Sequence, residues 1–237
     1  MRRAGLSVLI GITLLCGCAT PSPQTKSAPP DPILQQAAAL PYTPVDGAGW
    51  KSLFDGRTLK DWKVTDYGGH AAVHCDAGLM VFESGDALTG VNWTKDYPKV
   101  NYEIALEAMR IDGGDFFCGL TFPVKDSFCT LILGGWGGQM VGLSSIDGED
   151  ASENETSQLM KFESNRWYRV RLRVTDGKIE VWLDDKQIMD LPTAKRTIGL
   201  RFGEIEDSKP LGLTTYQTRG AMREIKLRLL AGDELKR

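Results

Sequence analysis

Alternation of apolar and polar residues with a period of two is the feature that most restricts how this chain can fold. The ranges 102–107, 168–174 and 178–183 place large apolar residues at every second position. In an extended strand, this pattern turns one face towards the core and the other face outwards. Short turn sequences separate such runs, at 75–78, 175–178 and 184–187. Since no range shows a long helical period, we expect an all-β sandwich or barrel.

The N-terminus resembles a bacterial lipoprotein signal. Arg2 and Arg3 precede an apolar run at 6–15, which is too short to cross a bilayer as a permanent helix. The sequence Leu-Cys-Gly-Cys follows, with a small residue before its second cysteine. The resemblance implies a signal peptide over residues 1–17 and lipid attachment at Cys18. An ordinary secretory signal that is cleaved nearby is the alternative.

The residues after the lipidated cysteine indicate location and domain organisation. Ala19, rather than an aspartate, follows Cys18. In bacterial lipoproteins, this difference implies anchoring in the outer membrane. Two or more acyl chains make such anchoring stable. We expect a lipid-anchored protein of the bacterial cell envelope. Residues 18–47 are rich in Pro, Ala, Ser and Gln, which predicts a flexible linker. One domain over 48–232 and a tail at 233–237 remain.

Charge and cysteine content exclude some classes of function. The net charge is −3, and no basic stripe or arginine-rich helix is present, so nucleic acid is not expected as a partner. Beyond the signal, the cysteines are Cys75, Cys118 and Cys129. Cys118 and Cys129 flank a predicted hairpin, which leaves open both a disulfide and two buried free thiols. No Cys-x-x-Cys or His-x-x-x-His spacing predicts a zinc site.

The range 134–156 has an unusual composition. Four glycines surround Trp136, and a polar segment with several carboxylates follows. Glycines let a ligand approach the backbone, and a tryptophan ring offers a flat face for a pyranose. We expect a site for sugar here, although a mobile loop with solvated carboxylates is the alternative. The expected substrate-binding residues are Trp93, Trp136, Ser144, Ser145, Asp150 and Asn154.

Three stretches of the domain resemble a known family. The range 49–64 contains Phe-x-Gly-x-x-Leu-x-x-Trp and resembles the opening of the 3-keto-disaccharide hydrolase domain family. The range 165–188 resembles a tryptophan-led strand and hairpin of that family, and 210–230 resembles its last two strands. The resemblance covers 48–231. It implies a concanavalin-like jelly-roll sandwich of two curved antiparallel sheets, the concave one able to hold a glycan.

The family resemblance implies chemistry on oxidised sugars. A ketone at C3 acidifies the hydrogen on C2, so a base can remove it and the substituent on C1 leaves; water adds afterwards. Such a site needs a base near C2 and an electrophile at the ketone oxygen. A divalent metal could be that electrophile, although no cofactor is certain. We expect Asp147 as the base and Glu155 as the acid. The strand at 129–138 carries no carboxylate, which departs from many members of the family.

Several alternatives remain open from the sequence. The expected partners are a carbohydrate and, through the lipid anchor, a bacterial membrane. The domain could cleave 3-keto-glycosides, act as a non-catalytic glycan-binding module or serve as a structural domain of the envelope. Asp112 and Asp115 could bind calcium or serve only in a turn. Arg201 and the acidic residues after it could line the same cleft or form solvated pairs.

Overall fold

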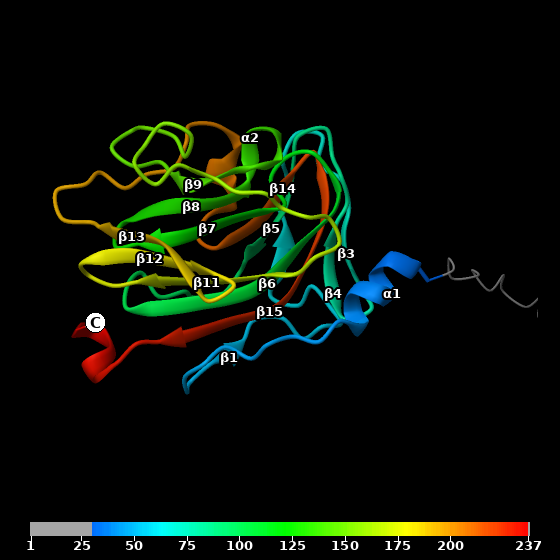
Figure 1. Ribbon diagram of the computed structural model, residues 1–237, viewed down its shortest axis with the longest axis horizontal. Coiled ribbons are helices and arrows are strands. Elements are labelled where there is room, and N and C mark those ends of the chain that lie inside the picture. Colours follow the sequence, from blue (N-terminus) through cyan, green and yellow to red (C-terminus); the bar gives the residue numbers. More distant parts are fainter. Residues whose placement is uncertain (1–29, 237) are drawn as a thin grey trace, which may run out of the picture. The chain divides into compact units, whose positions relative to one another are not determined.

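The computed structural model describes residues 30–236, which form two antiparallel β-sheets packed face to face (Figure 1). This confirms the all-β, jelly-roll-like fold expected from the sequence. The predicted signal peptide, Cys18 and the first part of the linker lie outside the described residues. Among residues 30–236, no helix is long and apolar enough to cross a membrane.

One sheet has eight strands. Its order is β13 (Lys186–Pro192), β12 (Lys178–Leu183), β11 (Tyr168–Val174), β6 (Tyr102–Gly113), β15 (Thr218–Leu229), β4 (Leu79–Phe82) and β3 (Val73–Asp76), with β1 (Lys51–Ser52) paired to β15. The turns predicted at 75–78, 175–178 and 184–187 connect β3 to β4, β11 to β12 and β12 to β13.

The other sheet has seven strands. Its order is β10 (Gln158–Leu159), β9 (Met140–Ser144), β8 (Ser127–Gly134), β7 (Cys118–Val124), β14 (Gly212–Tyr216), β5 (Leu88–Trp93) and β2 (Trp62–Val64). The short helical elements are α1 (Pro32–Ala39), α2 (Gly135–Gly138), η1 (Glu204–Ser208) and η2 (Gly232–Lys236). Because η2 is bound through an ion pair between Glu234 and Arg228 at 2.7 Å, the predicted tail is ordered in part.

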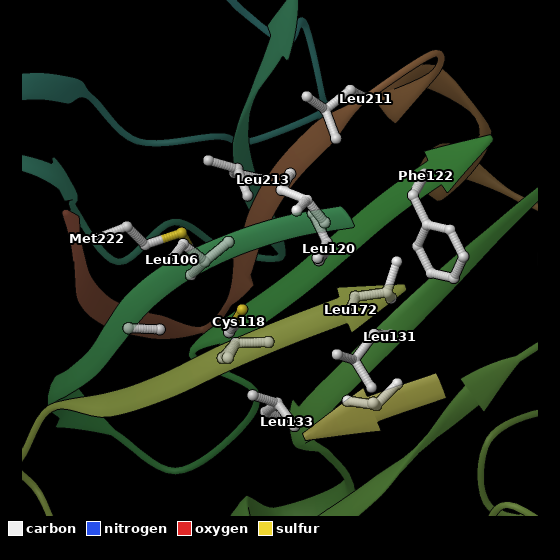
Figure 2. Packing of buried hydrophobic residues seen from close by; sticks show 14 of the residues in the cluster. Leu106, Cys118, Leu120, Phe122, Leu131, Leu133, Leu172, Leu211, Leu213 and Met222 are labelled. Atoms are coloured by element: carbon white, nitrogen blue, oxygen red, sulfur yellow. The ribbon is translucent and has the colours of Figure 1, made fainter. Parts of the chain in front are cut away.

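The main core lies between the two sheets. Leu120 and Leu131 project into it from the seven-stranded sheet, and Leu106 and Leu172 project from the eight-stranded sheet (Figure 2). All four side chains are buried. The alternation read from the sequence is confirmed, because the apolar residues of β11 are buried and its arginines lie on the opposite face.

The other face of the eight-stranded sheet carries arginines directly opposite glutamates. Glu103 on β6 lies between Arg173 on β11, at 2.7 Å, and Arg228 on β15, at 2.5 Å. Glu107 pairs with Arg223 at 2.7 Å. Because cross-strand partners have opposite charges, this face remains paired although its glutamates are buried.

The structure decides between the two states that the sequence allowed for Cys118 and Cys129. The predicted hairpin forms as β7 and β8, but Cys118 pairs with Leu133 and Cys129 pairs with Phe122. The two sulfurs are therefore not opposite each other, and both cysteines are free. Burial raises the pKa of each thiol to about 12, so both remain protonated at neutral pH.

Helix α1 corrects the prediction that residues 18–47 form a flexible linker. Asp31 caps the helix by accepting a hydrogen bond from the Ile33 amide at 2.8 Å. Leu34 and Ala37 are buried against an apolar cluster on the outer face of the eight-stranded sheet. The polar composition hid Leu34 and Ala37, two apolar residues spaced three apart, which is enough for one helix face to pack.

Replacing Leu34 with alanine tests the packing of α1. We expect the free energy of unfolding to fall by about 2 to 5 kcal/mol, because the Leu34 side chain is 1% exposed and its removal leaves a cavity. The control is Ile33→Ala on the same helix, where the side chain is 40% exposed. Urea unfolding measures both variants. Equal losses for the two would show that α1 does not pack as described.

Candidate functional site

The face of the seven-stranded sheet that points away from the core carries small and polar residues. Asn92, Gly212, Thr121, Thr130 and Ser144 lie side by side across β5, β14, β7, β8 and β9. The hydroxyl oxygens of Thr121 and Thr130 are 2.8 Å apart. We call this set the polar row. Asn92 and Thr121 are hydrogen-bonded to the segment 207–209, which leaves Thr130 and Ser144 of the row to line a cleft.

Glycines on this face allow other segments to fold onto the sheet. A Cβ atom at Gly142 on β9 would lie 2.6 Å from the Ala151 carbonyl oxygen, and one at Gly212 would lie 2.4 Å from the Ser208 carbonyl oxygen. No larger residue would fit at these two positions without moving the neighbouring backbone. The segments around Ala151 and Ser208 thereby form walls above the sheet.

Asn154 fixes the first wall, formed by residues 145–157. Its buried amide nitrogen donates to the carbonyl oxygens of Leu143, Glu149 and Asp150, at 2.7 to 3.1 Å. Its side-chain oxygen accepts from the amide and the hydroxyl of Thr156, at 3.0 and 2.6 Å. The loop is therefore built around one amide side chain and is held close to β9.

This loop places the Asp150 carboxylate against the sheet. One of its oxygens accepts hydrogen bonds from the Ser144 hydroxyl at 2.5 Å and from the Ala151 amide at 2.7 Å. The other oxygen lies 2.7 Å from a guanidinium nitrogen of Arg201. The carboxylate thus has a fixed orientation and a cationic partner.

A left-handed turn presents the Trp136 ring beside this pair. Gly134, Trp136 and Gly137 have φ angles of 81°, 46° and 85°. From below, the Arg110 guanidinium donates to the carbonyl oxygens of Gly134 and Gly138, and burial lowers its pKa. Asp115 accepts from the Gly137 amide at 3.1 Å. The turn is thereby fixed while the Trp136 ring stays 44% exposed.

These elements enclose a cleft of about 470 Å³, within the usual range for a small-molecule site. Figure 1 shows α2 and the orange segment that contains η1 near the same end of β8 and β9. The cleft is lined by Ala87, Leu88, Asp115, Phe116, Thr130, Ile132, Trp136, Ser144, Asp150, Arg201, Phe202, Glu204, Ile205 and Tyr216.

The cleft brings together three of the residues predicted to bind substrate: Trp136, Ser144 and Asp150. The predicted base and acid lie elsewhere. Asp147 and Glu155 both form ion pairs with Arg196 on the outer side of the loop, and neither lines the cleft. The two carboxylates are therefore together, as expected, but they face solvent.

The other predicted binding residues support the structure around the cleft. Asn154 organises the loop, as described above. Ser145 is buried and pairs through its backbone with Gly199, at 2.7 and 3.0 Å. Trp93 packs edge-on against Trp62, with ring centroids 5.2 Å apart, and contacts the main core.

Two cleft residues, Arg201 and Asp115, appeared in the sequence analysis only as alternatives. Asp115 accepts hydrogen bonds from the amides of Phe116 and Gly137, which agrees with a turn role rather than with calcium binding. Sequence reasoning missed Phe116, Phe202 and Tyr216. The sequence offered one signal for Phe202: this aromatic residue precedes Gly203 in a range without strand alternation, which is typical of an exposed loop.

The sequence analysis left open whether the domain binds a divalent metal. In the described part of the chain, no set of side chains is arranged to bind one. No group of three His, Cys, Asp or Glu side chains lies close enough together there to hold an ion. In the cleft, both oxygens of Asp115 and both oxygens of Asp150 already accept hydrogen bonds or ion pairs.

Residues 49–228 match the family described as the 3-keto-alpha-glucoside-1,2-lyase-like domain. The chain belongs to this family. The description of the family names a glucoside, which is a carbohydrate. The matched residues include every strand of both sheets, except for the last residue of β15. None of the curated proteins compared with the chain matches it.

Solved structures share the fold at low sequence identity. The Crh5 transglycosylase in complex with NAG is 11% identical with a TM-score of 0.52, over 78% of this chain and 85% of that one. A Bacillus subtilis protein of unknown function with a galectin-like fold is 12% identical with a TM-score of 0.49, over 73% and 92%. The carbohydrate-binding module CBM66 from Bacillus subtilis is 11% identical with a TM-score of 0.48, over 71% and 95%. The likeness to the transglycosylase shows the fold alone.

The Asp147 ion pair predicts a pH-dependent contribution to stability. Hydrogen bonds from the Thr197 amide and from Arg196 lower the pKa of Asp147. A carboxyl with a lowered folded-state pKa stabilises the protein above its unfolded pKa, and this stabilisation is lost as the pH falls through the folded value. The difference in melting temperature between wild type and Asp147→Asn should therefore be present at neutral pH, start to shrink near about pH 4 and disappear only at pH values below the lowered pKa of Asp147.

A matched control for this measurement is Asp126→Asn. Asp126 is almost fully exposed in its pair with Lys99, so its replacement should change the melting temperature little at any pH. A difference for Asp147→Asn that persists unchanged down to about pH 2 would contradict the role given to the ion pair.

Proposed function

We propose that the domain cleaves 3-keto-glycosides by elimination and that the cleft over β8 and β9 holds the sugar. Family membership supports the reaction class. The observation that carries the site is the position of Arg201. Its guanidinium lies 2.7 Å from Asp150 and 5.8 Å from the centroid of the Trp136 ring. A pyranose stacked on Trp136 would therefore reach a carboxylate and a cation at once.

Asp150 is the proposed base. It removes the proton from C2, the electron pair forms the C2–C3 double bond of an enolate, and the ketone oxygen takes the negative charge. The enolate then re-forms the ketone, the electron pair of its C2–C3 double bond forms a C1–C2 double bond, and the oxygen on C1 leaves and takes up the proton that Asp150 carries. Water adds afterwards across C1 and C2, and the net result is hydrolysis.

Arg201 is the proposed electrophile. A guanidinium near the C3 oxygen stabilises the charge that develops there during proton removal. Ser144 and the Ala151 amide fix one oxygen of Asp150, so the carboxylate cannot rotate away from the sugar. Preorganisation of this kind avoids reorientation in the transition state.

We also propose that the domain acts at the bacterial cell envelope. Lipid attachment at Cys18 would anchor it in the outer membrane, facing the periplasm or the surface. Mass spectrometry of the protein purified from a bacterial membrane fraction tests this; an unmodified N-terminus after residue 17 would overturn it.

Replacing Asp150 with asparagine tests the mechanism. We expect the rate of release from a 3-keto-glucoside with a chromogenic leaving group to fall about 10²- to 10⁴-fold, because asparagine keeps the shape but cannot accept the proton. The unoxidised glucoside should not react with either protein. Assays with and without a chelator test the role of a metal.

Asp147→Asn is the matched comparison for Asp150→Asn. It lies three residues away on the same loop, and its ion pair faces away from the cleft, so we expect turnover close to wild type. Loss of turnover in Asp147→Asn with retention in Asp150→Asn would favour the base predicted from the sequence. If the wild type releases nothing but binds the sugar, the domain is a binding module.

Replacing Trp136 with alanine tests the stacking surface. We expect binding of a glucoside to weaken by about 1 to 3 kcal/mol, because an apolar face of the ligand loses its partner. Trp182→Ala is the control, since Trp182 stacks on Arg171 at 4.0 Å on the eight-stranded sheet. Calorimetry measures both variants, and equal affinities for Trp136→Ala and wild type would remove Trp136 from the site.

A further inference from the structure

The polar half of the cleft is centred on Thr130 of β8 and Ser144 of β9, whereas Ile132, farther along β8, belongs to the apolar cluster. Thr130 and Ser144 are direct cross-strand neighbours there. Asp150 and Arg201 lie above Ser144 and complete this half. The groups that the proposed mechanism uses are therefore on one side of the cleft.

The opposite half is apolar. Leu88 on β5 is the direct cross-strand partner of Tyr216 on β14. The ring of Phe116 lies 5.8 Å from the ring of Tyr216, and Ile132 and Ile205 belong to the same apolar cluster. All five residues line the cleft. Tyr67, which belongs to the same cluster, is buried.

Three of the four oxygens of the carboxylates that border the apolar half already accept hydrogen bonds. Glu204 accepts a hydrogen bond from the Gly68 amide at 3.0 Å. The two oxygens of Asp115 accept from the amides of Phe116 and Gly137. A second sugar placed in this half would bury hydroxyls among apolar side chains, and each unpaired hydroxyl costs free energy. An apolar ring placed there would instead gain about 25 cal/mol for each Å² removed from water.

We infer that the apolar half is the subsite for the leaving group and that the substrates are glycosides of apolar, ring-bearing alcohols or phenols rather than oligosaccharides. This inference rests on the proposed function, because it assigns the sugar to the polar half. Phe202 extends the subsite: its side chain lines the cleft but is 94% exposed, so it can close over a ring that binds below it.

A matched pair of substrates tests the inference. One is cyclohexyl 3-keto-glucoside, and the other is a 3-keto-disaccharide in which a second glucose takes the place of the cyclohexyl ring. Both leaving groups are alcohols on a six-membered ring, and they differ in polarity and in size because glucose carries additional hydroxyl groups. We expect kcat/KM to be about tenfold or more higher for the cyclohexyl glycoside, through a lower KM.

Substitutions in the apolar half test whether it causes the preference for the cyclohexyl glycoside. Ile205→Asn and Tyr216→Ser each place a polar group in the apolar half, and each should reduce the ratio of the two kcat/KM values towards one. Two variants on separate elements keep the test valid if one fails to fold. Leu159→Asn is the control: Leu159 is an exposed apolar residue on β10 outside the cleft, and its replacement should leave the ratio unchanged.

The outcomes separate this inference from the proposed function. Turnover of both substrates with an equal or higher kcat/KM for the disaccharide would overturn the inference and leave the proposed function standing. If neither substrate turns over, the proposed function fails, and calorimetry with the unoxidised cyclohexyl glucoside and disaccharide decides on the subsite. Tighter binding of cyclohexyl glucoside would support it, and equal or weaker binding would overturn it.

Discussion

The close approach of the loop 145–157 to β9 is the constraint on which the rest of the site depends. Gly142 has no side chain, so the Ala151 backbone can lie against the sheet, and Asn154 holds the loop there through its hydrogen bonds. The same approach carries Asp150 onto the Ser144 hydroxyl. A residue with a Cβ at position 142 would push the loop away and separate the carboxylate from the sheet.

The outer faces of the two sheets differ in what they contribute to stability and to the proposed site. The inner faces supply a continuous apolar core, and the outer face of the eight-stranded sheet is closed by arginine–glutamate pairs and by α1. The outer face of the seven-stranded sheet carries the polar row and, beside it, apolar residues such as Leu88, Ile132 and Tyr216. A rigid sheet under the polar row and separate walls above it allow charged groups to be held at fixed positions, which a flexible loop alone would not achieve.

Most of the fold was predictable because alternation and turn residues are local signals. The arginines of β11 and the turn before β12 needed no information from distant residues. The choice among the loop carboxylates was not predictable, since it depends on the contact of Asp150 with Arg201, which is remote in sequence. Asp147 has a φ of 54° at the tip of a tight turn, so its carboxylate points to Arg196, whereas Asp150 points to the sheet. Gly142 within the strand pattern was a local clue to close approach.

The most direct test of the central claim, that the cleft above β8 and β9 is the carbohydrate site, is a nuclear magnetic resonance titration of the tryptophan indole N–H signals with a glucoside. The chain contains six tryptophans, and Trp136 alone among them lines the cleft in the described structure. The account predicts that the Trp136 signal shifts on addition of sugar while that of Trp182, on the other sheet, stays in place. A shift of Trp182 with an unchanged Trp136 signal would contradict it.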